Sequence, residues 1–528
     1  MGERMKTDIV LYERIYQLIR SQIECGLLPE GSKLPSRADL CEEFHVSAKT
    51  VRSAVERLAE EGLIETSQRK LAVVRGSVQA EEKHDNAYLL VDKALAVDLF
   101  HTGRLICFPV IEQGIRLCTG EEWKIPLAIA EKMDPADSLS FWRCSRKLWR
   151  FFIARNGNDL ILRVVDSLGF SKIDPLPGTL ELRKSYLADI KKLIQYISCG
   201  GRPEKFRFED MSFLYGLSDE GTLGTNLYRV APDSPLRTDL MGLEQQIRSA
   251  EERYSRVYMD ILGLIDIGRY QPGDRLPSHL ELQKAYKVSA DTTNKAIRVL
   301  QDWGVVTARR GSGIYVAMDL EALKKAPIPE KMIACHLRRF LDSIELLSLT
   351  VREVALHAAV SATPDEAKNL KAALRRHWNE EYMYQRAPVA LLEFITQHIQ
   401  YKALREIYQV ILENYRISRC IPKLVTPLKT DKNAEIHQRV METAEHLLVE
   451  DKEAFSEKTS ELYRDIQQMI IGECKKLGYW QIAEQVYDGG ALWQERNILK
   501  PACKKEALTK LKPNGFYGRT KKTEYNNR

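Results

Sequence analysis

The sequence predicts a mainly α-helical chain in which a small unit of three helices and a β-hairpin occurs twice, each time followed by an all-helical bundle. Three observations predict this class. The stretch from Tyr12 to Val74 repeats without a gap from Tyr254 to Val316, with 19 identities in 63 positions. After each copy, apolar residues recur every three to four positions, as they do on one face of a helix. The 528 residues are 44% hydrophobic and 29% charged with no low-complexity block, which favours several globular domains.

Within each copy, serines mark where two helices begin. Ser36 and Ser278 each follow a Leu-Pro pair, whereas Ser47 and Ser289 each follow a valine. A serine side chain in this place accepts a hydrogen bond from a backbone N–H of the first helical turn. The four serines therefore predict the starts of the second and third helices in both copies.

Each copy ends in a predicted hairpin. Gly62 and Gly304 follow the last periodic residue of the third helix, where a helix end favours a residue that tolerates positive φ. In the second copy the β-rich runs "VVTARR" and "GIYVA" are joined by "RRGSG"; in the first, "LIETSQRKLAVV" carries Arg69 and Lys70 at its turn. Three helices and a hairpin make a winged helix, which places its third helix in the major groove of DNA.

The stretch "GSKLPSRADLCEEFHVSAKTVRSAVERLAEEGLIE" resembles the GntR-type winged helix of bacterial transcription factors, and the second copy shares the same pattern. Four positions where that family usually carries arginine are here apolar: Ala38, Ala48, Leu280 and Ala290. A further family arginine is kept as Arg52 but is Asn294 in the second copy, where Asp291 stands near the helix start and would repel a phosphate. The alternative reading is a winged helix kept for packing or protein contacts.

The side chains predicted to contact DNA are cations, hydroxyls and one amide on the third helices, their caps and the wings. In the first copy they are Ser36, Arg37, Ser47, Lys49, Thr50, Arg52, Arg69 and Lys70; in the second they are Ser278, Thr292, Thr293, Asn294, Lys295, Arg309 and Arg310. Cations bind phosphates by releasing counterions, whereas an asparagine can pair with adenine. We expect the first copy to dominate base reading and the second to add mainly backbone contacts.

The helical segments resemble, more distantly, the FCD effector domain of FadR-like regulators. The similar stretches are "LWRFFIARNGNDLILRVV" and "AEIHQRVMETAEHLLVEDKEAF". Many FCD domains bind a divalent metal through one Asp and three His, with a small carboxylate on the metal. Here Ser145 and Trp149 stand at the Asp and first His positions of the first half, and Ala387 and Leu391 at those of the second.

The broken ligand pattern predicts no metal and no cofactor. A carboxylate-like small-molecule effector is what the resemblance implies, and the candidate residues for binding it are Trp149, Asn158 and His437. Aromatic residues at this spacing also fit an ordinary core, and a lone helical histidine also fits a surface or core position.

Composition restricts the other classes of function. No apolar run reaches the roughly 20 residues of a membrane helix, the N-terminus has no apolar core of a signal peptide, and ten scattered cysteines form no CxxC pair. We therefore expect a cytoplasmic protein. Residues 496–528 carry ten Lys/Arg and two Glu, which gives them a net charge of +8, compared with +6 for the whole chain. We expect them to form a disordered basic tail. No phosphate loop or nucleophile motif stands out, so no enzyme is predicted.

The predicted order of units follows from these patterns. Winged helix 1 spans 8–77, an FCD-like helical domain 85–232, a connecting helix 236–253, winged helix 2 254–318, a second FCD-like domain 325–495 and the basic tail 496–528. The predicted function is a regulator of transcription that binds double-stranded DNA as two fused protomers, either as a monomeric pseudo-dimer or as a homodimer. The alternative is a scaffold or co-regulator that uses degenerate winged helices for protein contacts.

Overall fold

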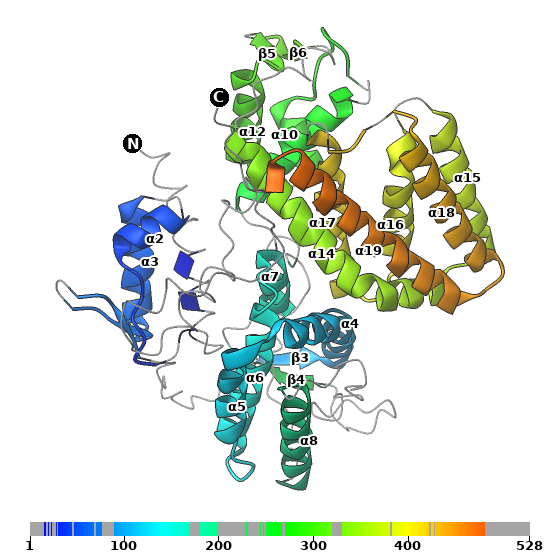
Figure 1. Cartoon of the computed structure of the whole chain (residues 1–528). Coiled ribbons are helices and arrows are strands. Elements are labelled where there is room, and N and C mark those ends of the chain that lie inside the picture. Colours follow the sequence, from blue (N-terminus) through cyan, green and yellow to red (C-terminus); the bar gives the residue numbers. More distant parts are fainter. Residues whose placement is uncertain are drawn as a thin grey trace, which may run out of the picture.

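The computed structural model is mainly α-helical, as predicted (Figure 1). It describes residues 15–16, 19–20, 23, 28, 30–44, 47–67, 70–75, 89–168, 180–198, 227–230, 243, 247, 250–266, 270–286, 288–309, 311–318, 330–380, 383–421, 424–426 and 428–480. Within these residues the β-structure consists of three two-stranded antiparallel sheets. The predicted basic tail and the wing residues Arg69 and Arg310 lie outside the described residues.

The first winged helix has the predicted elements. They are α2 (Arg37–Phe44), α3 (Ala48–Glu60), β1 (Ile64–Glu65) and β2 (Val73–Val74), preceded by helical residues between 15 and 23. β1 and β2 pair antiparallel, with Ile64 opposite Val74. Its apolar core consists of residues between 15 and 74, so this unit encloses its own core.

The second winged helix has the same order of elements, with longer strands. Its elements are α10 (Ala250–Asp266), α11 (His279–Tyr286), α12 (Ala290–Asp302), β5 (Val306–Arg309) and β6 (Gly313–Val316). The starts of α11 and α12 follow those of α2 and α3 by the offset of the repeat, 279 − 37 = 242 and 290 − 48 = 242. Gly62 and Gly304 have φ of 69° and 72°, which confirms the predicted left-handed helix ends.

The helical segment after the first winged helix begins and ends with a strand. Its elements are β3 (Leu89–Asp92), α4 (Lys93–Leu117), the 3-10 turn η1 (Gly120–Trp123), α5 (Lys124–Glu131), α6 (Ser138–Ala154), α7 (Asp159–Leu168), α8 (Leu180–Ser198) and β4 (Leu227–Val230). β3 pairs antiparallel with β4, Leu89 opposite Val230. Periodicity did not predict this sheet, because each strand is only four residues long.

The segment after the second winged helix is longer and wholly helical. Its elements are α14 (Glu330–Ser361), α15 (Pro364–Asn379), η5 (Tyr384–Arg386), α16 (Ala387–His398), α17 (Lys402–Arg416), η6 (Ile417–Cys420), α18 (Asp431–Leu448) and α19 (Lys452–Lys476). Of the helices described, none combines the length and apolarity needed to cross a membrane.

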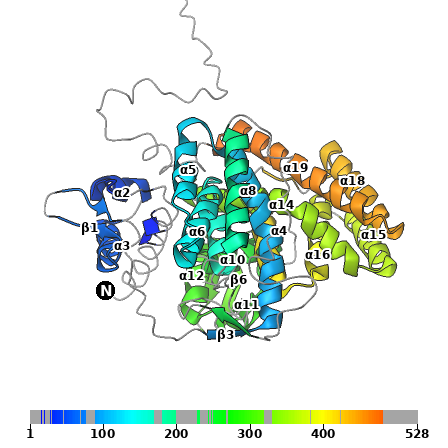
Figure 2. The same ribbon diagram turned by 90° about the horizontal axis from the view of Figure 1, so that it is seen from below.

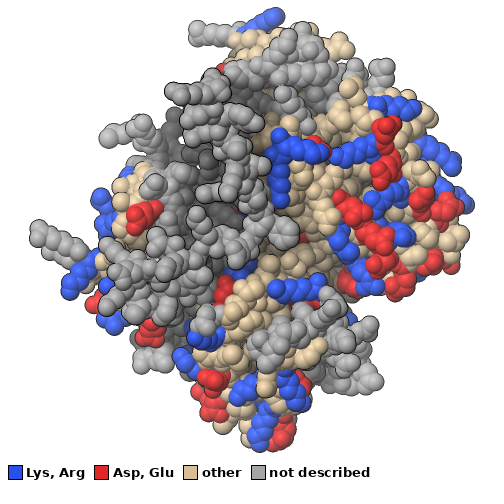
Figure 3. All heavy atoms as spheres, viewed as in Figure 1, with Lys and Arg blue, Asp and Glu red and all other residues tan. Residues whose placement is uncertain are grey.

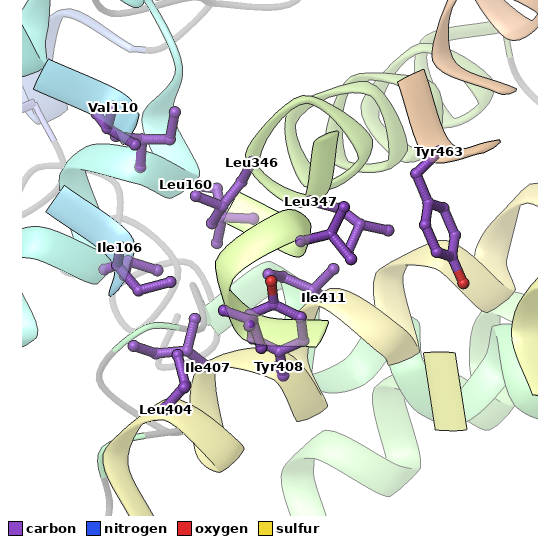
Figure 4. Packing of buried hydrophobic residues seen from close by; sticks show 14 of the residues in the cluster. Ile106, Val110, Leu160, Leu346, Leu347, Leu404, Ile407, Tyr408, Ile411 and Tyr463 are labelled. Atoms are coloured by element: carbon purple, nitrogen blue, oxygen red, sulfur yellow. The ribbon is translucent and has the colours of Figure 1, made fainter. Parts of the chain in front are cut away.

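The two helical segments enclose one common hydrophobic core, which we call the helical body. The core joins buried residues of α4 to α7 with those of α14 to α19. α4 packs against α14, α7 against α14, and α17 against α4 (Figures 1 and 2). In Figure 4, Ile106 of α4 and Leu160 of α7 face Leu346 of α14 and Ile407 of α17, and all four side chains are buried.

Polar contacts also cross between the halves of the helical body, near the starts of α7 and α17. Asn158 Nδ2 donates to the Asp342 carbonyl (2.9 Å) and to Glu345 Oε2 (2.8 Å) of α14. On the other side, Asp98 of α4 accepts from the backbone N–H of Lys402 (2.6 Å) and that of Ala403 (3.0 Å), so it caps α17 from outside. A carboxylate at a helix N-terminus satisfies donors that have no partner within the helix.

Acid should destabilise the fold, because four histidines are held below their ordinary pKa. Burial lowers the pKa of His336, His357, His377 and His437, and a neighbouring arginine or second histidine lowers it further. The unfolded chain therefore takes up these protons first, so the unfolding free energy should fall as pH drops below about 6.5. Buried His336 alone gives a slope of up to about 1.4 kcal/mol per pH unit. Urea denaturation between pH 8 and pH 5 measures this, and a constant unfolding free energy would contradict it.

Candidate nucleic-acid interface

The third helix of each winged helix is capped in the same way. Ser47 Oγ accepts from the Thr50 N–H at 3.2 Å and lies 2.8 Å from Thr50 Oγ1. Ser289 and Thr292 form the same pair, at 3.3 and 2.9 Å. Each cap fixes the backbone conformation at the first turn of its helix, so α3 and α12 start with the same local geometry.

The solvent face of α3 carries two cations in its first half. Lys49 and Arg52 are exposed and three residues apart, so they lie on one face, and Glu56 continues that face one turn further on. Val51, Ala54, Val55 and Leu58 are buried on the opposite face. The predicted pair Lys49 and Arg52 is thus brought together where a major groove would be read.

The solvent face of α12 carries a different set. Asp291, Asn294, Lys295 and Arg298 are all exposed. Arg298 follows Asp291 by seven residues, which places it on the same face. Therefore α12 presents two cations, Lys295 and Arg298, in its middle and not at its start.

Two predicted contact residues are turned away from solvent. Thr50 is 1% exposed and Thr293 is 0% exposed. Thr293 Oγ1 donates to the Ala290 carbonyl of its own helix at 2.9 Å. Threonine can satisfy its hydroxyl within the preceding turn, so it is tolerated in a core position that sequence periodicity alone assigns to either face.

The serines before α2 and α11 are engaged in reciprocal caps. Ser36 Oγ accepts from the Asp39 N–H (3.1 Å) while its own N–H donates to Asp39 Oδ2 (3.2 Å). Ser278 and Glu281 make the same pair of bonds, at 3.3 and 2.7 Å. These capping boxes use the side chain and backbone that the prediction assigned to DNA.

Each wing adds cations beside the third helix. Lys70 is exposed in the first wing. In the second, the exposed Arg309 guanidinium carbon lies 4.5 Å from the centre of the Tyr315 ring, a cation–π contact that orients the side chain. Sequence reasoning missed Lys33 and Arg275, which are exposed and pair with the wing strands opposite Val73 and Tyr315. Both matched positions carry a cation, and this shared charge could have identified them from the sequence.

The two winged helices are supported differently behind the third helix. In the first, the Tyr16 hydroxyl donates to Glu61 (2.6 and 2.5 Å to its two oxygens), and Arg57 stacks 4.1 Å from the centre of the Tyr16 ring. Burial and this bond raise the pKa of Tyr16 to about 12. These partners all belong to the same winged helix.

In the second winged helix the matched tyrosine reaches the helical body instead. Tyr258 shares a buried hydrogen bond of 2.5 Å with His336 Nε2 of α14 and packs edge-on against Trp303, which stands where the first copy has Glu61. Ser255 also bonds to Arg339 of α14, and Ile417 of η6 belongs to the core of this winged helix. The second winged helix is therefore joined to the helical body by core packing and by two hydrogen bonds to α14, one of them buried.

Removing one hydroxyl should test this difference. Tyr258→Phe leaves buried His336 without that hydrogen bond, so we expect the unfolding free energy to fall by about 1–3 kcal/mol. Tyr16→Phe is the matched control, and it should cost less, because Glu61 is about one-third exposed and water can replace the tyrosine. Chemical denaturation of both variants measures this, and equal losses would argue against the junction.

The three effector candidates have separate partner sets. Trp149 Nε1 donates to the Tyr186 hydroxyl at 2.7 Å, and Asn158 bonds across to α14 as described above. His437 stacks on Trp378 with ring centres 4.6 Å apart. The structure therefore uses Trp149 and Asn158 in packing within the body, and His437 has a different partner.

The charge on the helical body is mixed. Over α15, α18 and α19, Lys/Arg and Asp/Glu side chains are interspersed in Figure 3. Within the described part of the chain, no group of three or more His, Cys, Asp and Glu is placed to hold a metal ion. The exposed cations that share one helix face with hydrogen-bonding side chains are thus best defined on α3 and α12.

Comparisons with known proteins agree with this geometry. The model of the family described as "Bacterial regulatory proteins, gntR family" matches residues 11–74 and 253–316. Over 127 residues (24% of this chain) the sequence is 29% identical to the Uxu operon transcriptional regulator of Escherichia coli, of which the match covers 49%, about half its length. Over 248 residues (44% of this chain) it is 24% identical to the Uxu operon regulator of Haemophilus influenzae, of which the match covers 80%.

Among solved structures, Streptococcus agalactiae GntR is 18% identical, with 41% of this chain and 99% of that one covered and a TM-score of 0.19.

Proposed function

We propose that this chain, which carries two GntR-family domains, is a transcriptional regulator that binds double-stranded DNA through both winged helices. The observation that carries the proposal is the pair of equally capped third helices, each exposing cations and hydrogen-bonding side chains on one face. A winged helix reads bases with this helix and contacts the phosphates with its wing and flanking cations.

We further propose that the chain acts as a pseudo-dimer. Support comes from how the helical body is built: α14 is the counterpart of α4, and α17 that of α7, by the same 242-residue offset. The contacts between the two halves are reciprocal: α7 packs on α14, and its counterpart α17 packs on α4, the counterpart of α14. Such reciprocal contacts are the mark of an isologous dimer interface. In this chain the surface that would join two protomers is occupied within one molecule.

We also propose that a small carboxylate-like effector acts through the helical body, whose two segments we infer to be FCD-like domains. Effector binding would affect DNA binding through the junction of α14 and η6 with the second winged helix, because that junction fixes the position of α12 relative to the body. An effector that binds one arrangement of the body more tightly shifts the population between two spacings of the winged helices. Ala387 and Leu391 are buried apolar residues, so the proposed binding is metal-independent.

The alternative proposal, a scaffold or co-regulator, is favoured by one observation. Leu280 of α11 is 60% exposed beside the third helix, where an apolar side chain suits a protein partner better than a phosphate. The two proposals differ in what they predict for DNA alone.

A binding titration with purified full-length protein separates them. We expect binding to fragments of promoter DNA from the source organism, with log affinity falling linearly with log salt because bound counterions are released. Footprints on the bound fragments would then locate the operators. A lack of binding even at low salt would overturn the DNA-binding proposal and support the scaffold.

A further inference from the structure

The exposed faces of α3 and α12 differ at four matched positions that a groove would meet, although Ala48 and Ala290 at their starts are alike. Four pairs of residues occupy equivalent places, separated by 242 residues: Lys49 and Asp291, Arg52 and Asn294, Ser53 and Lys295, Glu56 and Arg298. All are exposed except the partly buried Ser53. By contrast, the residues behind these faces stay alike, with Ala54 matching Ala296 and Leu58 matching Leu300, all fully buried.

The local frame around these positions is the same in both copies. The Ser47–Thr50 and Ser289–Thr292 caps have equal geometry, and α3 and α12 each have 13 residues. Before α2, Lys33 forms an isolated antiparallel β-bridge with Val73 of the wing, and before α11 Arg275 forms the matching bridge with Tyr315. Equivalent side chains would thus reach equivalent depths in a groove, so the difference between the copies lies in their chemistry.

The exposed side chains of α3 and α12 are suited to hydrogen-bond with different bases. Lysine and arginine pair with the O6 and N7 acceptors of guanine, which suits Lys49 and Arg52. Asparagine pairs with N6 and N7 of adenine, and aspartate accepts from N4 of cytosine, which suits Asn294 and Asp291. Residues near the start of the third helix contact bases. Among the exposed ones there, Lys49 differs from Asp291 and Arg52 from Asn294.

The order of charge along the helix is also reversed. On α3 the positive Lys49 precedes the negative Glu56, whereas on α12 the negative Asp291 precedes the positive Arg298. Seven residues span roughly 10 Å along a helix. The exposed face is therefore positive at the start of α3 but two turns later on α12, so the two helices favour different base and phosphate contacts along a half-site.

We propose that the two winged helices recognise unlike half-sites, the first guanine-directed and the second directed to adenine and cytosine, and that the chain binds its operator in one orientation. This inference rests on the proposed DNA-binding function. A homodimer of identical protomers is restricted to two equal readers and a palindromic operator. Fusion of the protomers removes that restriction, because each copy is then free to change by itself.

Selection from random duplex DNA with full-length protein tests the inference. The wild type should enrich sites made of two different half-sites at fixed spacing. The variant Asp291→Lys/Asn294→Arg gives α12 the base-reading residues of α3, and it should instead enrich an inverted repeat of the first half-site. Its affinity for that repeat should exceed the wild type's by at least roughly 5- to 150-fold, the range for one correct base pairing. The reciprocal variant Lys49→Asp/Arg52→Asn should enrich an inverted repeat of the second half-site.

Footprinting with the wild-type operator tests the orientation. In Lys49→Ala/Arg52→Ala protein, protection should be lost over one half-site, always the same one, while Asp291→Ala/Asn294→Ala should affect the other. Circular dichroism checks the fold of each variant, whose changed residues are all exposed.

The outcomes separate the two levels of the proposal. Selection of a palindrome by the wild type, or equal loss of protection over both half-sites, would overturn the unlike half-sites while leaving DNA binding intact. No enrichment of any sequence, with no binding at low salt, would overturn the proposed function itself.

Discussion

Lys49→Ala/Arg52→Ala protein should bind its operator about 10- to 100-fold more weakly than the wild type at fixed salt, because a base-directed arginine is worth about 1–3 kcal/mol. Both side chains are exposed on one face of α3, which Ser47 caps. Each phosphate contact that is lost also lowers the slope of log affinity against log salt by about 0.9. Fluorescence anisotropy at several salt concentrations measures both quantities.

The matched control removes two cations from the helical body. Lys132→Ala/Lys191→Ala changes net charge by the same amount, and both lysines are exposed, next to α5 and on α8. Affinity should change less than about threefold, since exposed charges beyond a Debye length of about 8–10 Å are screened. Equal losses in the two double variants would mean that overall charge, and not the α3 face, determines binding.

Leu160→Ala should lower the unfolding free energy by about 2–5 kcal/mol, the cost of a cavity in a packed core. Leu160 of α7 is 1% exposed and faces Leu346 of the other half (Figure 4). Because both halves share this core, we expect them to unfold together in one transition, which the substitution shifts as a whole. Differential scanning calorimetry measures the transition.

The same substitution in the first winged helix serves as the comparison. Leu58 is fully buried in a core made of residues between 15 and 74. Leu58→Ala should therefore destabilise that unit and leave the transition of the helical body at its wild-type temperature. Two separate body transitions, of which Leu160→Ala moves only one, would contradict a shared core.

Sequence reasoning predicted those parts of the fold that local rules determine. The capping serines 47 and 289, the left-handed glycines 62 and 304 and the wing beginning at Val306 lie where they were predicted. Each depends on a hydrogen bond or a backbone angle within a few residues. Only part of the predicted connecting helix 236–253 lies among the described residues: Leu243 and Ile247 are helical and buried, and α10 begins at Ala250.

Features set by tertiary packing were outside the reach of local patterns. Thr50 and Thr293 were predicted to contact DNA but are buried, since a threonine fits either face of an amphipathic helix. Asn158 was chosen by family resemblance as an effector candidate, yet its amide bonds to α14 across the halves. No pattern within either segment shows which residues of the other will lie opposite.

The two tyrosines of the repeat make the same point. Tyr16 and Tyr258 are identical in sequence and equally buried, but one bonds to Glu61 of its own unit and the other to His336 of the helical body. The exchange of Glu61 for Trp303 was visible in the alignment of the copies. What it meant depended on where α14 lies in the fold.

The most direct test of the central claim, that one chain supplies both DNA readers, is the mass of its complex with a duplex of the selected operator. Multi-angle light scattering after size exclusion should give one 60.6 kDa chain per duplex, with footprints over both half-sites. The free protein should be a monomer at the same concentration. Two chains per duplex, or a free dimer that is required for binding, would contradict the claim.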